Sequence, residues 1–140
     1  MRISSDDRRI GFFDLFDLPL GDLNIIRLHP GAICAWHRHQ RQEDWLFCVQ
    51  GTIRVGRTEC TPGEMAVTLK DNPEQFVQWD TLDEHNPRTL CVPIGTWHGY
   101  QNIGAGDAVI VLYATNKYDG SDEERRSLQA MGISWDRQPR

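Results

Sequence analysis

The sequence predicts an all-β protein, built as a sandwich or barrel of short strands. Short runs rich in β-branched and aromatic residues recur along the whole chain, and turn-forming residues separate them. Only one segment has a helical pattern. Strands that follow one another at this spacing favour a sandwich or barrel over a parallel sheet with crossover helices.

Each expected strand is bounded by proline, glycine or asparagine residues, as in His29-Pro30-Gly31 and Thr61-Pro62-Gly63. The predicted strands are residues 11–18, 23–28, 33–39, 44–49, 52–57, 65–68, 76–82, 88–92, 98–102 and 108–115. The one predicted helix covers residues 122–131. Ser121 is a suitable N-cap with Glu124 three residues later, Leu128 and Met131 give an apolar edge, and Gly132 ends the helix.

Length and charge limit the class of protein. The 140 residues form one domain, 1–140, and the net charge of −5 argues against binding nucleic acid by phosphate neutralisation. No stretch approaches the ~20 apolar residues needed to span a membrane, and the N-terminus lacks the apolar run of a secretion signal. The four cysteines form no CxxC pair, so we expect free thiols in a reducing cytoplasm.

Three of the five histidines stand where a reaction would need them. His37 and His39 are two residues apart in a predicted strand, so their side chains point to the same face. Glu43 and Asp44 follow after a short polar turn, and His98 stands in a later glycine-containing segment. These groups indicate a polar site inside the barrel, either functional or the lining of a pocket that has lost its function.

Two motifs around these histidines resemble those of the cupin superfamily. The first, over residues 31–51, is a glycine followed by His37-x-His39, an acid and a second glycine. The second, over residues 93–102, reads PxGxxHxxxN. The resemblance implies a double-stranded β-helix jelly roll with the histidines inside.

The C-terminal half more narrowly resembles the dTDP-4-dehydrorhamnose 3,5-epimerases. The similarity runs through residues 76–100, LYATNKY at 112–118 and GISW at 132–135. It implies an epimerase or isomerase acting on a nucleotide-activated 4-keto sugar, without a cofactor. It further implies His37 as the catalytic base and Tyr113 as the acid, both pointing into the barrel. The substrate-binding candidates are His39, Arg54, His98 and Tyr118.

The chemistry explains why a base and an acid are needed. A base whose pKa is near neutral removes an acidic proton from the carbon beside the ketone, and an acid on the other face of the sugar returns a proton. A cation or a hydrogen-bond donor stabilises the enolate that forms between these two steps. The sequence departs from the family at this last group, with Cys34 at an arginine position and Asp44 at a lysine position. A related sugar-nucleotide reaction and a lost activity both remain open.

The same residues allow a second hypothesis, a metal-dependent cupin enzyme for a small molecule. The candidate ligands to one divalent transition metal are His37, His39, Glu43, Asp44 and His98. A histidine that binds metal cannot also act as a free base, so the two hypotheses compete at His37. We favour the metal-free interpretation, because the narrower resemblance is to a metal-free family. A non-catalytic sugar-binding cupin is the third possibility.

The expected assembly is a homodimer. Small cupins and the epimerase family commonly pair, and the N-terminal stretch at 12–16, FFDLF, is apolar enough to need a partner surface. The expected partners are therefore a small nucleotide-sugar substrate and a second copy of the chain.

Overall fold

The computed structural model describes residues 1–14, 19–60 and 76–135, and it confirms an all-β fold with one short helix. The described elements are β1 (Arg2–Ser5), β2 (Arg9–Phe13), β3 (Asp22–Leu28), β4 (Ile33–His39), β5 (Asp44–Gln50), β6 (Thr52–Thr58), β7 (Gln78–Asp83), β8 (Thr89–Val92), β9 (Trp97–Asn102), β10 (Ala108–Ala114), the 3-10 turn η2 (Gly120–Asp122), β11 (Glu123–Arg125) and α2 (Leu128–Met131).

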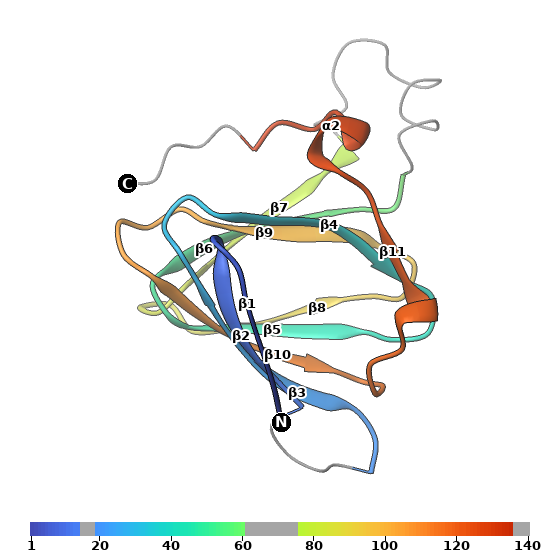
Figure 1. Cartoon of the computed structure of the whole chain (residues 1–140). Coiled ribbons are helices and arrows are strands. Elements are labelled where there is room, and N and C mark those ends of the chain that lie inside the picture. The colour runs from blue at the N-terminus through green and yellow to red at the C-terminus, as the bar shows by residue number, and fades with distance from the viewer. Residues whose placement is uncertain (15–18, 61–75, 136–140) are drawn as a thin grey trace.

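The strands form two antiparallel sheets, as expected for a jelly roll. Sheet A has the order β1-β2-β3-β10-β5-β8, and sheet B has the order β11-β4-β9-β6-β7. Figure 1 shows the two sheets one above the other, with α2 on the outer side of sheet B. Some neighbouring strands, such as β3 and β10 or β4 and β11, are distant in sequence, so residues from both ends of the chain reach the space between the sheets.

Apolar side chains fill two separate cores. The first lies between the sheets and includes Ile26, Leu46, Val55 and Ile110, each at most 1% exposed. The second lies on the outer face of sheet B, where its buried members are Trp36, Val77, Trp97, Met131, Ile133 and Trp135. The C-terminal segment covers this second core, so apolar side chains pack against both faces of sheet B.

An irregularity in β4 decides which of its side chains face inward. Ala35 pairs with Gly99 and His37 with His98, so Trp36 is an extra residue in the strand. Trp36 can therefore join the outer core while both His37 and His39 turn inward. Gly99 permits the close approach, because a Cβ there would collide with the Cβ of Ala35.

Most of the predicted strands agree with the structure to within one or two residues. The predicted strand at 65–68, and residues 15–18 of the first one, lie outside the described residues. Strands β1 and β11 were not predicted from the sequence. Among the described residues, no helix has the length and apolar character that a membrane crossing requires.

The prediction of a helix over residues 122–131 is wrong in its first half. Asp122 is buried, and its carboxylate accepts hydrogen bonds from the backbone N–H groups of Gln40 (2.9 Å) and Arg41 (3.2 Å). Residues 123–125 then pair with β4 as an edge strand. The helix begins only after Ser127, whose hydroxyl caps it, and ends at Gly132 as predicted.

Candidate functional site

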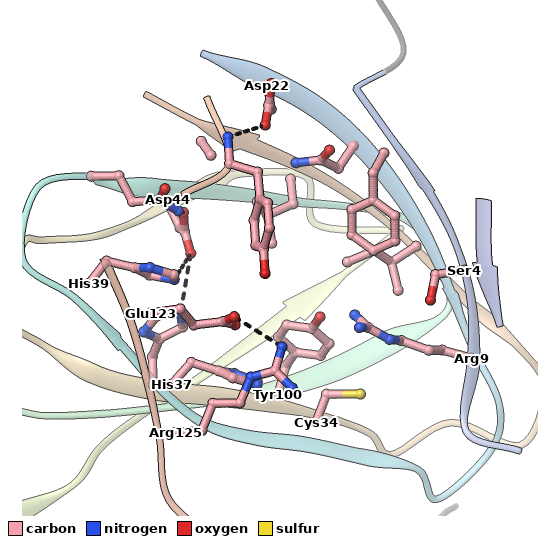
Figure 2. Close-up of a pocket in the computed structure, with 18 of the residues that line it drawn as sticks. Ser4, Arg9, Asp22, Cys34, His37, His39, Asp44, Tyr100, Glu123 and Arg125 are labelled. Atoms are coloured by element: carbon pink, nitrogen blue, oxygen red, sulfur yellow. Dashed lines mark hydrogen bonds and ion pairs between the residues drawn. The ribbon is translucent and has the colours of Figure 1, made fainter. Parts of the chain in front are cut away.

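The candidate site is a cavity of about 860 Å³ between the two sheets. Strands β3, β4, β5, β9 and β10 supply its walls, and β1, β2, β11 and the segment after β10 line its opening. Figure 2 shows His39 and Asp44 at one end of the cavity and Arg9 and Ser4 at the other. The site therefore has an imidazole–carboxylate end and a cationic end.

At the first end, His39, Asp44 and His98 lie close together. The Nε2 atom of His98 is 3.2 Å from Oδ2 of Asp44, and Nε2 of His39 is 3.6 Å from the same oxygen. Gln42 donates to the other carboxylate oxygen at 2.7 Å. Asp44 and His98 are each 4% exposed, so the group is largely removed from water.

The backbone fixes the tautomer of His98. Its Nδ1 lies 3.0 Å from the carbonyl oxygen of Thr96, which can only accept a hydrogen bond. Nδ1 therefore carries a proton, and in the neutral ring the lone pair is on Nε2, facing the Asp44 carboxylate. The Asp44 oxygen is also an acceptor, so a proton or a cation must lie between these two atoms.

The environment shifts the pKa values of this group. Burial disfavours the charged form of Asp44, but the hydrogen bond from His98, the charges of His98 and His39 and the hydrogen bond from Gln42 outweigh it, so the pKa of Asp44 is lowered. Burial also lowers the pKa of His39, against the attraction of Asp44. The end of the cavity thus keeps Asp44 as an anion.

His37 stands beside this group with a different character. Its ring centre is 6.0 Å from that of His98, and it lines the cavity as the sequence predicts. Burial, followed by repulsion from His98 and Arg125, lowers the pKa of His37 to about 3. At neutral pH the ring is uncharged, so one nitrogen carries a free lone pair.

Tyr118 and its neighbours belong to the opening of the cavity. Tyr118 lines the cavity, as predicted for a substrate-binding residue, and its backbone N–H donates to Asp22 at 2.8 Å. Lys117 bridges Asp14 (3.1 Å) and Asp22 (3.6 Å). These contacts hold the segment after β10 against the cavity.

The prediction that Tyr113 points into the barrel is wrong. Leu112 and Ala114 line the cavity, so Tyr113 between them faces the outer side of sheet A, where it is 36% exposed. Its register partners are Leu23 and Trp45, which share that outer face. Tyr113 therefore cannot serve as the acid in this cavity.

Arg54 and Glu43 are also outside the cavity. Arg54 lies between the inward-facing Ile53 and Val55, and its guanidinium stacks on Trp79 at 3.5 Å from the ring centre. The carboxylate of Glu43 accepts from the thiol of Cys91 at 3.2 Å. Neither the substrate-binding prediction for Arg54 nor the metal-ligand alternative for Glu43 agrees with these positions.

Sequence reasoning missed several residues of the cavity. Arg9 from β2 and Tyr100 from β9 lie near Cys34 at the cationic end, while Arg125 and Glu123 lie beside the histidines (Figure 2). Tyr100 could have been found, because it is two residues after His98 on a predicted strand. The others come from β2 and β11, and no pattern in the sequence indicates that these segments contribute to the site.

The donor set fits a divalent metal at His39, Asp44 and His98. One ligand atom from each of these residues lies within 4.8 Å of the others, and the Nε2 lone pair of His98 points at this space. His37 is not part of the group. The expected conflict at His37 between a metal ligand and a free base is thus removed by the geometry.

The fold and this cavity define a cupin-like jelly roll. The solved structures that resemble it include the capsular polysaccharide assembling protein CapF from Staphylococcus aureus (TM-score 0.72, 16% identity, 89% of this chain and 33% of that one). Another is the oxalate decarboxylase of Lactobacillus farciminis (TM-score 0.65, 17% identity, 99% of this chain and 39% of that one). At such low identity these likenesses establish the fold alone.

Two curated proteins are similar in sequence, whereas no family model matches the chain. The probable low-salt glycan biosynthesis epimerase Agl13 of Haloferax volcanii is 36% identical over 69% of this chain, which spans 60% of that relative. The spore coat polysaccharide biosynthesis protein SpsL of Bacillus subtilis is 30% identical over 94% of this chain and 88% of its own length. The chain belongs to the family of SpsL.

Proposed function

We propose that this protein is an epimerase or isomerase that acts on a nucleotide-activated 4-keto sugar, with His37 as the catalytic base. The observation that carries the proposal is the neutral imidazole of His37 inside a cavity large enough for a sugar. The names of two relatives, a probable glycan biosynthesis epimerase and a polysaccharide biosynthesis protein, support a sugar substrate.

His37 can take a proton because its lone pair is free at neutral pH. A carbon acid beside a ketone is weak, so the imidazolium formed must be stabilised while the substrate is bound. An anionic substrate would provide that stabilisation, since it would oppose the repulsion from His98 and Arg125 that lowers the pKa of His37. The base is therefore best suited to a substrate that carries negative charge.

Tyr118 takes the place that the sequence assigned to Tyr113. It is a tyrosine that lines the same cavity as His37, and it comes from the segment after β10 at the opening. Its phenol can donate a proton to the substrate carbon from the side opposite the base. In this proposal Tyr118 is the acid, and Tyr113 has no part in the reaction.

The cations along the cavity support binding of a sugar nucleotide. The positively charged side chains that line the cavity are Arg2, Arg8, Arg9, Lys117, Arg125 and Arg126. Arg8 pairs with Asp6 and Arg125 with Glu123, whereas no carboxylate of the described residues pairs with Arg9. We assign to Arg9 the contact with a phosphate of the substrate or with the oxygen of the enolate.

Deuterium exchange tests this proposal directly. In deuterated water the protein should replace the protons beside the ketone of dTDP-4-keto-6-deoxyglucose with deuterium. Proton NMR follows the loss of their signals. His37→Gln should slow this exchange by about a hundredfold or more, the usual effect of losing a general base. His29→Gln is the matched control, because His29 pairs with Asp107 at 3.3 Å and does not line the cavity. Exchange at the wild-type rate in His37→Gln would refute the assignment of His37 as the base.

A metal-dependent reaction is the second candidate, favoured by the grouping of His39, Asp44 and His98. A divalent cation held by these three residues would supply Lewis-acid polarisation of a carbonyl oxygen. Hydrogen bonds already orient two of the three ligands for a metal, since Thr96 orients His98 and Gln42 orients Asp44. In this arrangement His37 still serves as the base.

A further inference from the structure

Tyr100 is a buried residue of the cavity to which the proposed reaction assigns no role. It lies in β9, two residues after His98, so both side chains point to the same face of sheet B. Its register partner in β4 is Cys34, as His37 is the partner of His98. The phenol therefore stands one step along the strands from the two histidines, with its Cα about 7 Å from that of His98.

The ring and the hydroxyl of Tyr100 have different surroundings. The ring belongs to the apolar core between the sheets, and the residue is 4% exposed. Figure 2 shows the hydroxyl at the cavity, on the side of Arg9. Because the core holds the ring in one orientation, the hydroxyl is a fixed polar group beside the space that a substrate fills.

Tyr100 keeps its hydroxyl proton at neutral pH. Burial raises the pKa of Tyr100 well above its ordinary value, and the charge of Arg9 and a hydrogen bond from it offset this rise only in part. Since Arg9 donates to the phenol oxygen, the hydroxyl proton remains available for an acceptor in the cavity. The group is therefore a permanent hydrogen-bond donor.

We infer that Tyr100 is a catalytic residue whose hydroxyl donates a hydrogen bond to the enolate oxygen of the substrate. The inference rests on the proposed function. His37 takes the proton from the carbon beside the ketone, the electrons of that C–H bond form the C=C bond of the enolate, and the π electrons of the carbonyl group move onto its oxygen. The hydroxyl proton stays on Tyr100 throughout, because burial disfavours the phenolate.

The position of Tyr100 suits this role. The oxygen of an enolate is two bonds from the carbon that loses its proton, so its hydrogen-bond donor must lie close to the base. Tyr100 and His37 meet this condition, since they line the same cavity from adjacent strands. Arg125, the cation that acts on His37, is already paired with Glu123 at 3.0 Å. Arg9 has five N–H donors and can therefore contact both Tyr100 and a phosphate of the substrate.

The kinetics of Tyr100→Phe test the inference. Phenylalanine keeps a ring in the apolar core and removes only the hydroxyl. With dTDP-4-keto-6-deoxyglucose in deuterated water, kcat for exchange should fall by about a hundredfold, because the hydrogen bond strengthens as the enolate forms. KM and the affinity for dTDP should stay within about threefold of the wild type. Tyr113→Phe, on the outer face of sheet A, is the matched control and should keep the wild-type kcat.

Circular dichroism reports whether Tyr100→Phe is folded, and Tyr100→Leu, which also lacks the donor, replaces it if it is not. A loss of kcat with unchanged dTDP affinity would support the inference. A wild-type kcat in Tyr100→Phe would overturn the inference and leave the proposed function intact. A loss of dTDP affinity with unchanged kcat would also overturn it, because the hydroxyl would then only hold Arg9 in place. Absence of exchange in the wild type would overturn the proposed function, and the inference with it.

Discussion

Tyr113 and Tyr118 are close in the sequence but lie on opposite sides of the barrel wall. Tyr113 is on the outer face of sheet A beside Trp45, whereas Tyr118 lines the cavity that contains His37. Of these two tyrosine hydroxyls, only that of Tyr118 is placed to reach a substrate in the cavity.

Removing each hydroxyl should therefore have different effects. Tyr118→Phe should lower the rate of epimerisation of dTDP-4-keto-6-deoxyglucose by about a hundredfold, because no acid returns the proton. The rate of deuterium exchange should fall less, since His37 still abstracts the proton beside the ketone. Tyr113→Phe is the control and should keep the wild-type rate. Equal losses in both variants would contradict the assignment of the acid.

The buried His37 should make the folded state sensitive to acid. Its pKa is about 3 when folded and near 6.5 when unfolded, so only the unfolded chain gains a proton in this window. The stability it contributes is present above pH 6.5 and is lost as the pH falls towards 3, by about 1.4 kcal/mol per pH unit for one proton.

Urea unfolding between pH 4 and pH 7 measures this dependence. His37→Gln should flatten the slope of unfolding free energy against pH, and His85→Gln, at an exposed turn, controls for the substitution itself. An unchanged slope in His37→Gln would show that His37 is protonated to the same extent in both states.

Metal binding should depend on three ligands and not on His37. Isothermal titration of Mn²⁺ or Ni²⁺ into metal-free protein should show one site per chain, lost in His98→Ala and Asp44→Asn. His37→Gln should retain the site, because His37 is outside the group. Loss of binding in His37→Gln with retention in His98→Ala would show that the ligands are assigned wrongly.

Arg9 should contribute to binding of the nucleotide. Arg9→Ala should weaken the binding of dTDP by about tenfold or more, as for a lost charge-assisted hydrogen bond. Arg88→Ala removes a cation that pairs with Asp80 at 3.3 Å outside the cavity, and it should leave the affinity unchanged. Equal affinities of the wild type and Arg9→Ala for dTDP would show that Arg9 does not contact the nucleotide.

The all-β fold could be predicted from the sequence, because the alternation of apolar and polar residues and the turn residues between strands are local signals. The positions of His37, His39 and His98 in the cavity were also predictable from their place on those strands. The helix at 122–131 was misjudged because the carboxylate of Asp122 binds backbone groups far away in the sequence, which no local pattern reveals.

Two of the site errors could have been avoided from the sequence. Arg54 lies between Ile53 and Val55, and alternation along a strand places such an arginine outside an apolar interior. The same alternation would have separated Tyr113 from the cavity residue Leu112. In both cases the assignment followed the family resemblance and not the periodicity. The contribution of Arg9 was beyond prediction, since it depends on β2 crossing the opening.

The short strand β11 has a consequence for the state of the protein in solution. Strand β4, which carries His37 and His39, has β9 on one side and only β11 on the other. Were the three residues of β11 displaced, the backbone N–H and C=O groups of β4 would lie open along the edge of sheet B. Such an edge recruits strands from other molecules. The segment that lines the candidate site thus also covers the edge of β4 against such pairing.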